Sequence, residues 1–240
     1  MNDSEEPPIV FRDRRDGGRR LVPKLERYRA QPGTIVLGLP RGGAVTAAEI
    51  ATGLDLPLDV IISRKIGAPD NPEFAIGAIA EGGEPYLSED GLALTEASRT
   101  YLDTEIARQR AEITRRQQLF RGGKPLTLPK NATVILVDDG VATGATVIAA
   151  LHALRTQEVR HLVLAVPVAP PDTVAVLRRL VDELVVLSSP MMFWAVGAFY
   201  DDFAQVTDED VCRLLGCSHE TQAKRPGERS AHVRQKQKSR

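Results

Sequence analysis

Cysteine and long hydrophobic runs are scarce in this sequence. Only Cys212 and Cys217 are cysteines among the 240 residues, which is too few for a disulfide framework and favours a reduced pair. The longest apolar run, residues 162–168, is interrupted by Pro167, whereas a membrane-spanning helix needs about 18 apolar residues. The first ten residues, MNDSEEPPIV, are acidic and lack the basic and apolar regions of a secretory signal. We therefore expect a cytoplasmic protein.

Charge is distributed unevenly along the chain. The net charge is −1, yet residues 218–240 contain seven Lys/Arg and only two glutamates, so the rest of the chain is acidic. An acidic body argues against a nucleic-acid-binding core. The basic segment has almost no large apolar side chains to bury, which predicts a disordered tail that touches nucleic acid weakly at most. We accordingly divide the chain into an N-terminal extension (1–9), one domain (10–216) and a basic disordered tail (217–240).

Short apolar runs alternate with helical patterns throughout the domain. This alternation is typical of a doubly wound α/β fold, in which helices cover both faces of a mainly parallel sheet. A content of 42% apolar residues is enough for one such core. The sequence predicts strands over 35–39, 58–63, 133–137, 161–166 and 184–187, a flexible hairpin of 74–80 with 86–87, and helices over 44–54 (ended by Gly53), 95–120, 145–155 and 172–180.

The most informative segment reads VILVDDGVATGAT, at residues 134–146. Four aliphatic residues end in two adjacent carboxylates, Asp138 and Asp139, at the carboxyl end of a predicted strand, where open α/β sheets bind ligands. The following loop of small residues leads into a helix, so backbone N–H groups and the helix dipole favour an anion such as a phosphate monoester. Thr143 and Thr146 add hydroxyl donors. The segment predicts a phosphate site beside two acids.

Two carboxylates next to a phosphate would repel it unless another group lay between them. A ribose would do this, because its 5-phosphate would occupy the loop while its hydroxyl groups donate to Asp138 and Asp139, with a divalent cation screening the remaining charge. The acids could instead cap the helix, with the glycines and threonines forming a turn, but capping needs only one acid. The segment also lacks the features of nucleoside-triphosphate and dinucleotide loops. We therefore favour a ribose phosphate.

This segment resembles the signature of the type I phosphoribosyltransferases, in which a hydrophobic strand, two acids, a short linker and a Thr-Gly-x-Thr-like loop follow one another. The resemblance implies the type I fold, with Asp138 and Asp139 on the ribose of 5-phosphoribosyl 1-diphosphate (PRPP). Gly140 departs from the pattern, because a larger aliphatic residue commonly follows the acid pair. The resemblance also implies a cradle for the 5-phosphate, made of Ala142, Thr143, Gly144, Ala145 and Thr146.

A second segment matches the family after the first predicted strand. The sequence LGLPRGG, at 37–43, stands where family members bind diphosphate. The match implies that Arg41, Gly42 and Gly43 hold the leaving group, with a strained or cis peptide near Arg41. The other interpretation is a glycine-rich helix start beside a surface arginine.

Further along, Arg64 and Lys65 end the next predicted strand, where the family often has a cation directed at the diphosphate. Two adjacent cations at a strand end can equally form a solvated rim. Residues 67–84 stand in the position of the family's mobile active-site loop, whose closure would exclude water from a reactive sugar cation. Much of this segment could instead be an exposed hairpin, so its polar residues receive no individual roles.

The acceptor site is the least defined part. Residues 188–203 contain most of the aromatic side chains and loosely resemble the base-binding end of 6-oxopurine enzymes. That resemblance implies Phe193 or Trp194 on the base and Asp201 near it; the aromatic residues could equally close the core or a dimer contact. Where the 6-oxopurine enzymes carry an aspartate in the phosphate loop, this chain has Ala142, whose methyl group cannot exchange protons. The base stays undetermined.

Taken together, these features predict a phosphoribosyltransferase that moves the phosphoribosyl group from PRPP to a nitrogenous acceptor such as a nucleobase, by positioning and charge rather than by strong acid or base catalysis. The expected catalytic residues are Asp138, Asp139 and Arg41. Mg²⁺ is the expected cofactor, held indirectly by both acids through PRPP hydroxyls or water, and a homodimer is the expected assembly. The alternatives are a regulatory protein that senses PRPP or a nucleotide and, third, a ribosyl-phosphate hydrolase or phosphorylase.

Overall fold

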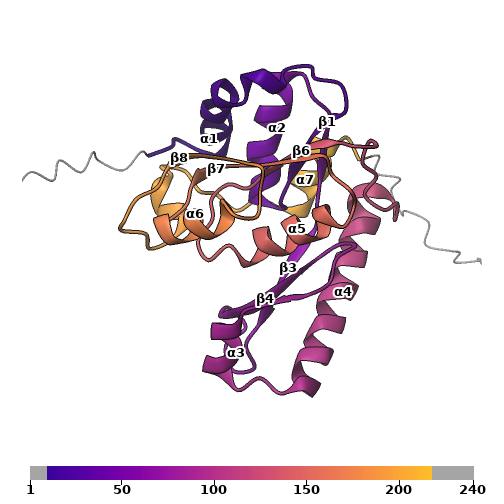
Figure 1. The fold of residues 1–240 in the computed structure, drawn as a ribbon, viewed down its shortest axis with the longest axis vertical. Coiled ribbons are helices and arrows are strands. Elements are labelled where there is room, and N and C mark those ends of the chain that lie inside the picture. The colour runs from indigo at the N-terminus through magenta and orange to yellow at the C-terminus, as the bar shows by residue number, and fades with distance from the viewer. Residues whose placement is uncertain (1–9, 218–240) are drawn as a thin grey trace, which may run out of the picture.

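The computed structural model describes residues 10–217 and contains two sheets (Figure 1). The predicted N-terminal extension and, apart from Cys217, the predicted tail lie outside this range. Five parallel strands are arranged in the order β2-β1-β6-β7-β8, and three antiparallel strands in the order β3-β4-β5. The parallel sheet consists of β1 (Thr34–Gly38), β2 (Leu58–Val60), β6 (Thr133–Val137), β7 (His161–Val168) and β8 (Glu183–Ser188).

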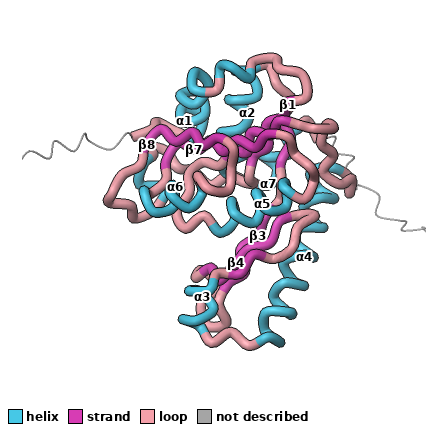
Figure 2. The backbone as a smooth tube through the Cα atoms, viewed as in Figure 1, coloured by secondary structure: helices cyan, strands magenta, loops and turns pink. Residues whose placement is uncertain are grey.

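Helices cover both faces of the parallel sheet (Figures 1 and 2). Successive residues of a strand point to opposite faces, so Ile135 and Val137 pack towards one pair of helices while Val134 and Leu136 pack towards the other. All four side chains are fully buried. The doubly wound α/β fold that the sequence predicts is thus confirmed. One face carries α1 (Arg14–Leu21) and α2 (Gly42–Leu54), and the other carries α5 (Ala145–Arg155) and α6 (Pro171–Leu177).

A smaller lobe extends from the parallel sheet at the bottom of Figure 1. Its strands pair antiparallel, and the predicted hairpin of 74–80 with 86–87 is present, with Gly77 opposite Leu87 and Ala78 opposite Tyr86. The elements of the lobe and the last helix are β3 (Ser63–Gly67), β4 (Ala75–Ala80), β5 (Tyr86–Leu87), α3 (Glu89–Thr95), α4 (Arg99–Arg121) and α7 (Asp208–Leu215); short 3₁₀ helices cover Val22–Lys24, Glu26–Tyr28 and Val196–Phe199.

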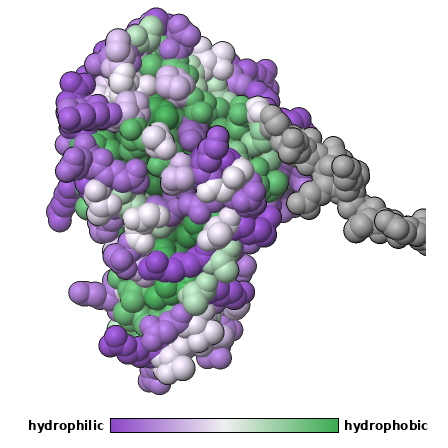
Figure 3. All heavy atoms as spheres, turned by 90° about the vertical axis from the view of Figure 1, so that its right-hand side faces the viewer, coloured by the Kyte–Doolittle hydropathy of each residue, from purple (hydrophilic) through white to green (hydrophobic). Residues whose placement is uncertain are grey.

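On the face shown in Figure 3, hydrophilic side chains frame the hydrophobic ones in both the upper body and the lobe. Across residues 10–217 there is no helix with the length and apolar character required to cross a membrane. Cys212 and Cys217 are both free thiols.

Several predicted boundaries differ from the observed ones, three of them by more than two residues. The strand expected over 58–63 is divided, because β2 ends at Val60 and β3 begins at Ser63 in the other sheet. Both Ile61 and Ile62, at the crossing, are fully buried, so the run of apolar residues hides the change of partner. The helix expected over 95–120 begins later, at Arg99, because Thr95 is the last residue of α3 and Glu96 after it has a left-handed backbone with φ of +48°. The helix expected to reach residue 180 ends at Leu177.

Gly53 does not end the helix that precedes the second strand, as the sequence had suggested. This helix, α2, continues to Leu54 and is followed by Asp55 in the left-handed region. A Cβ on Gly53 would lie 2.6 Å from Cγ2 of Val22. The glycine therefore allows the 3₁₀ helix at Val22–Lys24 to approach α2 closely.

A buried carboxylate joins the end of β4 to α4 and to the segment between β2 and β3, and we expect its neutralisation to destabilise the fold. Glu81 accepts hydrogen bonds from the Ile62 N–H (2.9 Å), from Gln117 (2.8 Å) and from Arg121, and only 3% of its side chain is exposed. Glu81→Gln should lower the free energy of unfolding by about 1.5–3 kcal/mol, because the hydrogen bond from Arg121 loses its charged acceptor. Chemical denaturation checks this, with the exposed Glu84→Gln as the control; equal stability of the two variants would contradict it.

Candidate active site

The acid pair follows the central strand of the parallel sheet and lies where the parallel strands have their carboxyl ends. Strand β6 lies between β1 and β7, and all five of its residues are buried. Asp138 and Asp139 follow directly, so both emerge at the carboxyl ends of the parallel strands. The diphosphate-loop candidates follow β1, which pairs with β6 in register, Gly38 opposite Val137. The sheet thereby brings together two segments that are about 100 residues apart in the sequence.

The carboxyl group of Asp138 is packed between the backbone of Asp139 and the loop that follows β1. Its Oδ1 accepts a hydrogen bond from the N–H of Asp139 at 2.9 Å. A Cβ on Gly43 would lie 2.8 Å from the same Oδ1, so the diphosphate-loop candidate packs directly on this carboxyl. Burial raises the pKa of Asp138 well above its usual value, and the negative charge of Asp139 raises it further. A cation or hydroxyl donors at this site would favour its ionised form.

Asp139 is held by an arginine from the other end of the chain. The Nε of Arg14, at the start of α1, donates to Oδ2 of Asp139 at 2.5 Å, and the two side chains are 12% and 13% exposed. The backbone carbonyl of Asp139 accepts a hydrogen bond from the hydroxyl of Tyr200. The pKa of Tyr200 is raised mainly by burial and then by the charge of Asp139, so this hydroxyl keeps its proton.

The loop between β6 and α5 has the form of an anion cradle. Gly144 adopts the left-handed conformation with φ of +81°, and α5 begins at the next residue. The N–H of Val141 donates to the carbonyl of Val168 (2.9 Å), whereas no backbone acceptor in the described part of the chain pairs with the N–H groups of residues 142–144. The first N–H groups of α5 also lack intrahelical acceptors. The predicted phosphate residues Ala142, Thr143, Gly144, Ala145 and Thr146 therefore surround a set of free amide donors.

The structure explains why the residue after the acid pair is glycine. A Cβ on Gly140 would overlap the side chain of Val196 and lie 3.1 Å from Cγ1 of Val168. The segment that contains Val196 thus approaches the acid loop too closely for the larger aliphatic residue that is common in the family.

The predicted diphosphate loop adjoins the acids. The peptide bond between Pro40 and Arg41 is cis, in line with the unusual peptide expected there. A Cβ on Gly42 would overlap the carboxylate of Asp139 and lie 2.7 Å from Nε of Arg14. Beside this loop is a cavity of about 360 Å³ with two cationic side chains and no carboxylate, lined by Arg14, Arg41, Gly42, Phe203, Gln205 and Val206.

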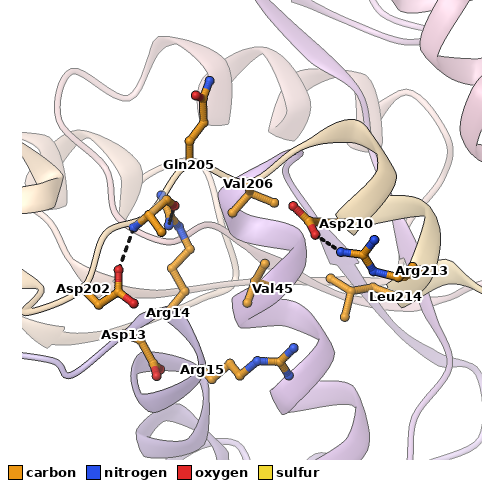
Figure 4. A pocket seen from close by; sticks show the side chains of 11 residues that line it. Asp13, Arg14, Arg15, Val45, Asp202, Gln205, Val206, Asp210, Arg213 and Leu214 are labelled. Carbon is orange, nitrogen blue, oxygen red and sulfur yellow. Dashed lines mark hydrogen bonds and ion pairs between the residues drawn. The ribbon is translucent and has the colours of Figure 1, made fainter.

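A second cavity of about 360 Å³ shares Arg14, Gln205 and Val206 with the first and lies between α1, α2 and α7 (Figure 4). The acids and bases that line it match in number, three arginines (Arg14, Arg15 and Arg213) against three aspartates (Asp13, Asp202 and Asp210), and Arg213 pairs with Asp210. Charge in this second cavity is therefore balanced, in contrast to the first.

Arg64 and Lys65 do not stand at the end of a strand, which corrects the expectation from the sequence. Both lie within β3, because the chain has already entered the small sheet at Ser63. The Nε of Arg64 donates to Gln109 of α4 at 3.0 Å, while Lys65 is exposed. Burial lowers the pKa of Arg64, and the positive charge of Arg116 lowers it further. The segment 67–84, expected as a mobile loop, includes β4 and its buried residues.

The aromatic residues of 188–203 divide into two groups. Phe199 and Tyr200 are buried and pack with Phe11 and Val168, which matches the alternative that they close the core. Phe193 packs on Phe199, with ring centroids 5.1 Å apart. Trp194 is 88% exposed, and Asp201 is also exposed. Of the two aromatic residues predicted for the acceptor, Trp194 therefore has the exposed ring, whereas Phe193 is packed on Phe199.

Sequence reasoning missed Arg14. The only signal for it was indirect, because two adjacent acids at a strand end require a nearby positive charge. Residues 14–21 carry two glycines and four arginines, which gave no indication of a helix facing the site. In residues 10–217, no group of three or more His, Cys, Asp or Glu side chains is arranged to hold a metal ion. Asp138 and Asp139 suit a magnesium ion that arrives with substrate phosphates, since Mg²⁺ commonly takes one or two carboxylates and completes its shell with phosphates and water.

Similarity to known proteins extends over most of the chain. The family described as "Phosphoribosyl transferase domain" matches residues 15–204. Two Mycobacterium tuberculosis proteins (strains CDC 1551 and H37Rv), provisionally named phosphoribosyl transferases, are 40% identical over 210 residues, covering 88% of this chain and 47% of each relative. The chain thus spans about half the length of these relatives. The crystal structure of TT1426 from Thermus thermophilus is 47% identical with a TM-score of 0.71, covering 86% of this chain and 98% of that one.

Proposed function

Because this chain belongs to the phosphoribosyl transferase family, we propose that it transfers the 5-phosphoribosyl group of PRPP to a nitrogenous acceptor, with release of diphosphate. In this reaction the bond between the anomeric carbon and the diphosphate oxygen breaks, a bond to the acceptor nitrogen forms, and the acceptor loses a proton. The observation that carries the proposal is the meeting of three features at one edge of the sheet: the acid pair, the loop of free amides and the cationic cavity beside Arg41.

Each feature has a part in this reaction. The amides of residues 142–146 and the start of α5 would bind the 5-phosphate. Asp138 and Asp139 would accept the ribose hydroxyl groups and stabilise the positive charge that develops on the ring. Arg41, with the backbone of Gly42 and Gly43, would bind the diphosphate as it leaves into the cavity that also contains Arg14.

Mg²⁺ would arrive with PRPP and neutralise diphosphate oxygens. The acid pair would hold it indirectly, through the ribose hydroxyls or water. Arg64 and Lys65 stay a prediction as further cations towards the diphosphate. As neighbours in β3 they point to opposite faces of that strand, so only one of them can face the diphosphate directly. A homodimer stays a prediction.

Titration calorimetry with PRPP and Mg²⁺, followed by a diphosphate-release assay over a panel of nitrogenous bases, tests the proposal. Acceptor-dependent release of diphosphate supports the transferase. Binding without turnover over the whole panel would favour the regulatory PRPP- or nucleotide-sensing protein, and loss of ribose phosphate without any acceptor would favour a hydrolase or phosphorylase. Absence of PRPP binding would contradict the proposal altogether.

The acceptor is the finer part of the proposal, and Trp194 is the side chain that would stack on it, with Phe193 as its support and Asp201 nearby. Its ring is 88% exposed, the highest fraction among the exposed large hydrophobic side chains of residues 10–217, and Val196, two residues further on, packs against Gly140 of the acid loop. Stacking of a base on an aromatic ring contributes about 1–3 kcal/mol in nucleic-acid-binding proteins. A planar nitrogenous ring is the corresponding acceptor class.

Trp194→Ala is therefore expected to raise the KM for the acceptor by about tenfold, while the affinity for PRPP stays unchanged. Steady-state kinetics with both substrates varied measures this. Met191→Ala, which removes a side chain that is 75% exposed in the same segment, is the control. Equal effects of the two variants would assign no specific role to the indole ring.

A further inference from the structure

The guanidinium of Arg14 contacts two further groups besides the carboxylate of Asp139. Its Nε donates to Asp139 at 2.5 Å and its Nη1 donates to the backbone carbonyl of Ala204 at 2.7 Å. The guanidinium also lies over the ring of Phe203, 3.7 Å from the ring centroid. Three partners thus restrain a single planar group. A lysine could not satisfy them together, because its ammonium is a point charge without the planar fork.

The opposite sides of Asp139 are restrained as well. The loop at Gly42 leaves no room for a Cβ beside its carboxylate, and the hydroxyl of Tyr200 donates a hydrogen bond to its backbone carbonyl. Asp139 is therefore enclosed by α1, the loop after β1 and the segment that follows β8. Arg14 is the only one of these contacts that carries a charge, and it is linked to Asp139 across 125 residues of sequence.

We propose that Arg14 is a positioning residue, which holds the carboxylate of Asp139 in the orientation that accepts a ribose hydroxyl group. The role rests on the proposed function, since it presumes a ribose phosphate at this site. Arg14 is the charged partner of the Asp139 carboxylate, and without it this carboxylate would turn towards solvent. That change would remove an acceptor from the sugar while leaving the amide cradle for the 5-phosphate intact.

The test compares two ligands that differ only in the sugar. Ribose 5-phosphate reports on the acids and the cradle together, whereas inorganic phosphate reports on the cradle alone. Titration calorimetry is performed with both on the wild type, on Arg14→Gln and on Arg15→Gln. The last variant is the matched control, because it removes the same charge from the next position of α1, where the arginine pairs with Glu49 instead.

In Arg14→Gln, the affinity for ribose 5-phosphate should fall by about tenfold while the affinity for inorganic phosphate changes little. Arg14→Lys should recover only part of the loss, and Arg15→Gln should behave like the wild type. Phe203→Leu removes the ring beneath the guanidinium without removing the charge, and should weaken ribose 5-phosphate by about threefold. If Arg14→Gln fails to fold, Phe203→Leu still tests the proposal, because it loosens the same guanidinium.

Several results would overturn the proposal. Equal losses for both ligands would mean that Arg14 acts on the fold or through its long-range charge. Tighter binding of ribose 5-phosphate by Arg14→Gln would make Arg14 a competitor of the sugar for Asp139. If the wild type binds inorganic phosphate but not ribose 5-phosphate, the proposed function fails and the positioning role fails with it; if the wild type binds both and Arg14→Gln matches it, only the positioning role fails.

Discussion

Replacing Asp138 with asparagine is expected to slow phosphoribosyl transfer by about 30- to 1000-fold, equivalent to about 2–4 kcal/mol of transition-state stabilisation. Asparagine can still accept the N–H of Asp139, which lies 2.9 Å from Oδ1, so the loop should keep its shape. It carries no negative charge to stabilise the cationic ribose ring. The expected loss is in kcat/KM for PRPP, measured by diphosphate release.

The same substitution should stabilise the ligand-free protein, and the gain should depend on pH. Because the pKa of Asp138 is raised in the folded state, the folded protein retains a proton that the unfolded chain has lost. The wild type therefore loses stability as the pH rises above the ordinary carboxyl value, whereas Asp138→Asn does not. At pH well below that value the two proteins should differ little.

Thermal unfolding between pH 4 and pH 8 measures this difference. For a domain of this size, each kcal/mol gained raises Tm by about 2–4 °C. Asp103→Asn, at an exposed position of α4, is the control and should show no such trend. A variant that is less stable than the wild type at pH 8, or a gain that does not grow with pH, would contradict the burial argument for Asp138.

Gly42→Ala is expected to lower activity by displacing the Asp139 carboxylate, without straining the backbone at position 42. Gly42 has no left-handed backbone, so alanine fits its φ angle, but the new Cβ would overlap the carboxylate of Asp139, with its Cγ only 2.6 Å away. The loop and the carboxylate must then separate. A displacement of about 1 Å in a reacting constellation can cost about 100-fold in rate, and we expect a loss of this order in kcat/KM for PRPP.

Gly33→Ala provides the matched control for this substitution. Gly33 has φ of +75° and no atom within 4 Å of the position of a Cβ, so alanine there strains the backbone far from the acids. That variant should lose about 1–2 kcal/mol of stability and keep its affinity for PRPP. Wild-type kinetics in Gly42→Ala would show that the loop does not rest on Asp139 in solution.

Segments 134–146 and 37–43 could be predicted in most detail from the sequence, because their structure follows from interactions between neighbouring residues. A strand of aliphatic residues needs to be buried, and the polar residues that follow it must emerge at its carboxyl end. Small residues before a helix leave amides free for an anion. For this reason the sequence predicted β6 and α5 with their observed bounds and predicted the acid pair between them.

The positions of Arg64, Lys65 and the aromatic residues were harder to predict, because burial alone does not identify a partner. Ile61 and Ile62 are buried whether the chain continues in one sheet or enters another, so nothing local marks the start of β3. In the same way, aromatic residues at 193–203 are apolar in either environment. Contacts with Phe11 decide that Tyr200 belongs to the core, whereas Trp194 has no such contact.

The sequence by itself determined the layered α/β architecture and the chemistry at the end of β6, since periodic burial and short-range capping act between neighbouring residues. Only the tertiary structure decided how the charge of that site is balanced. Arg14 and Asp139 meet because α1 packs on the sheet and the segment after β8 returns over it with Phe203. Such a pairing depends on the path of the whole chain, and no pattern within a short window specifies it.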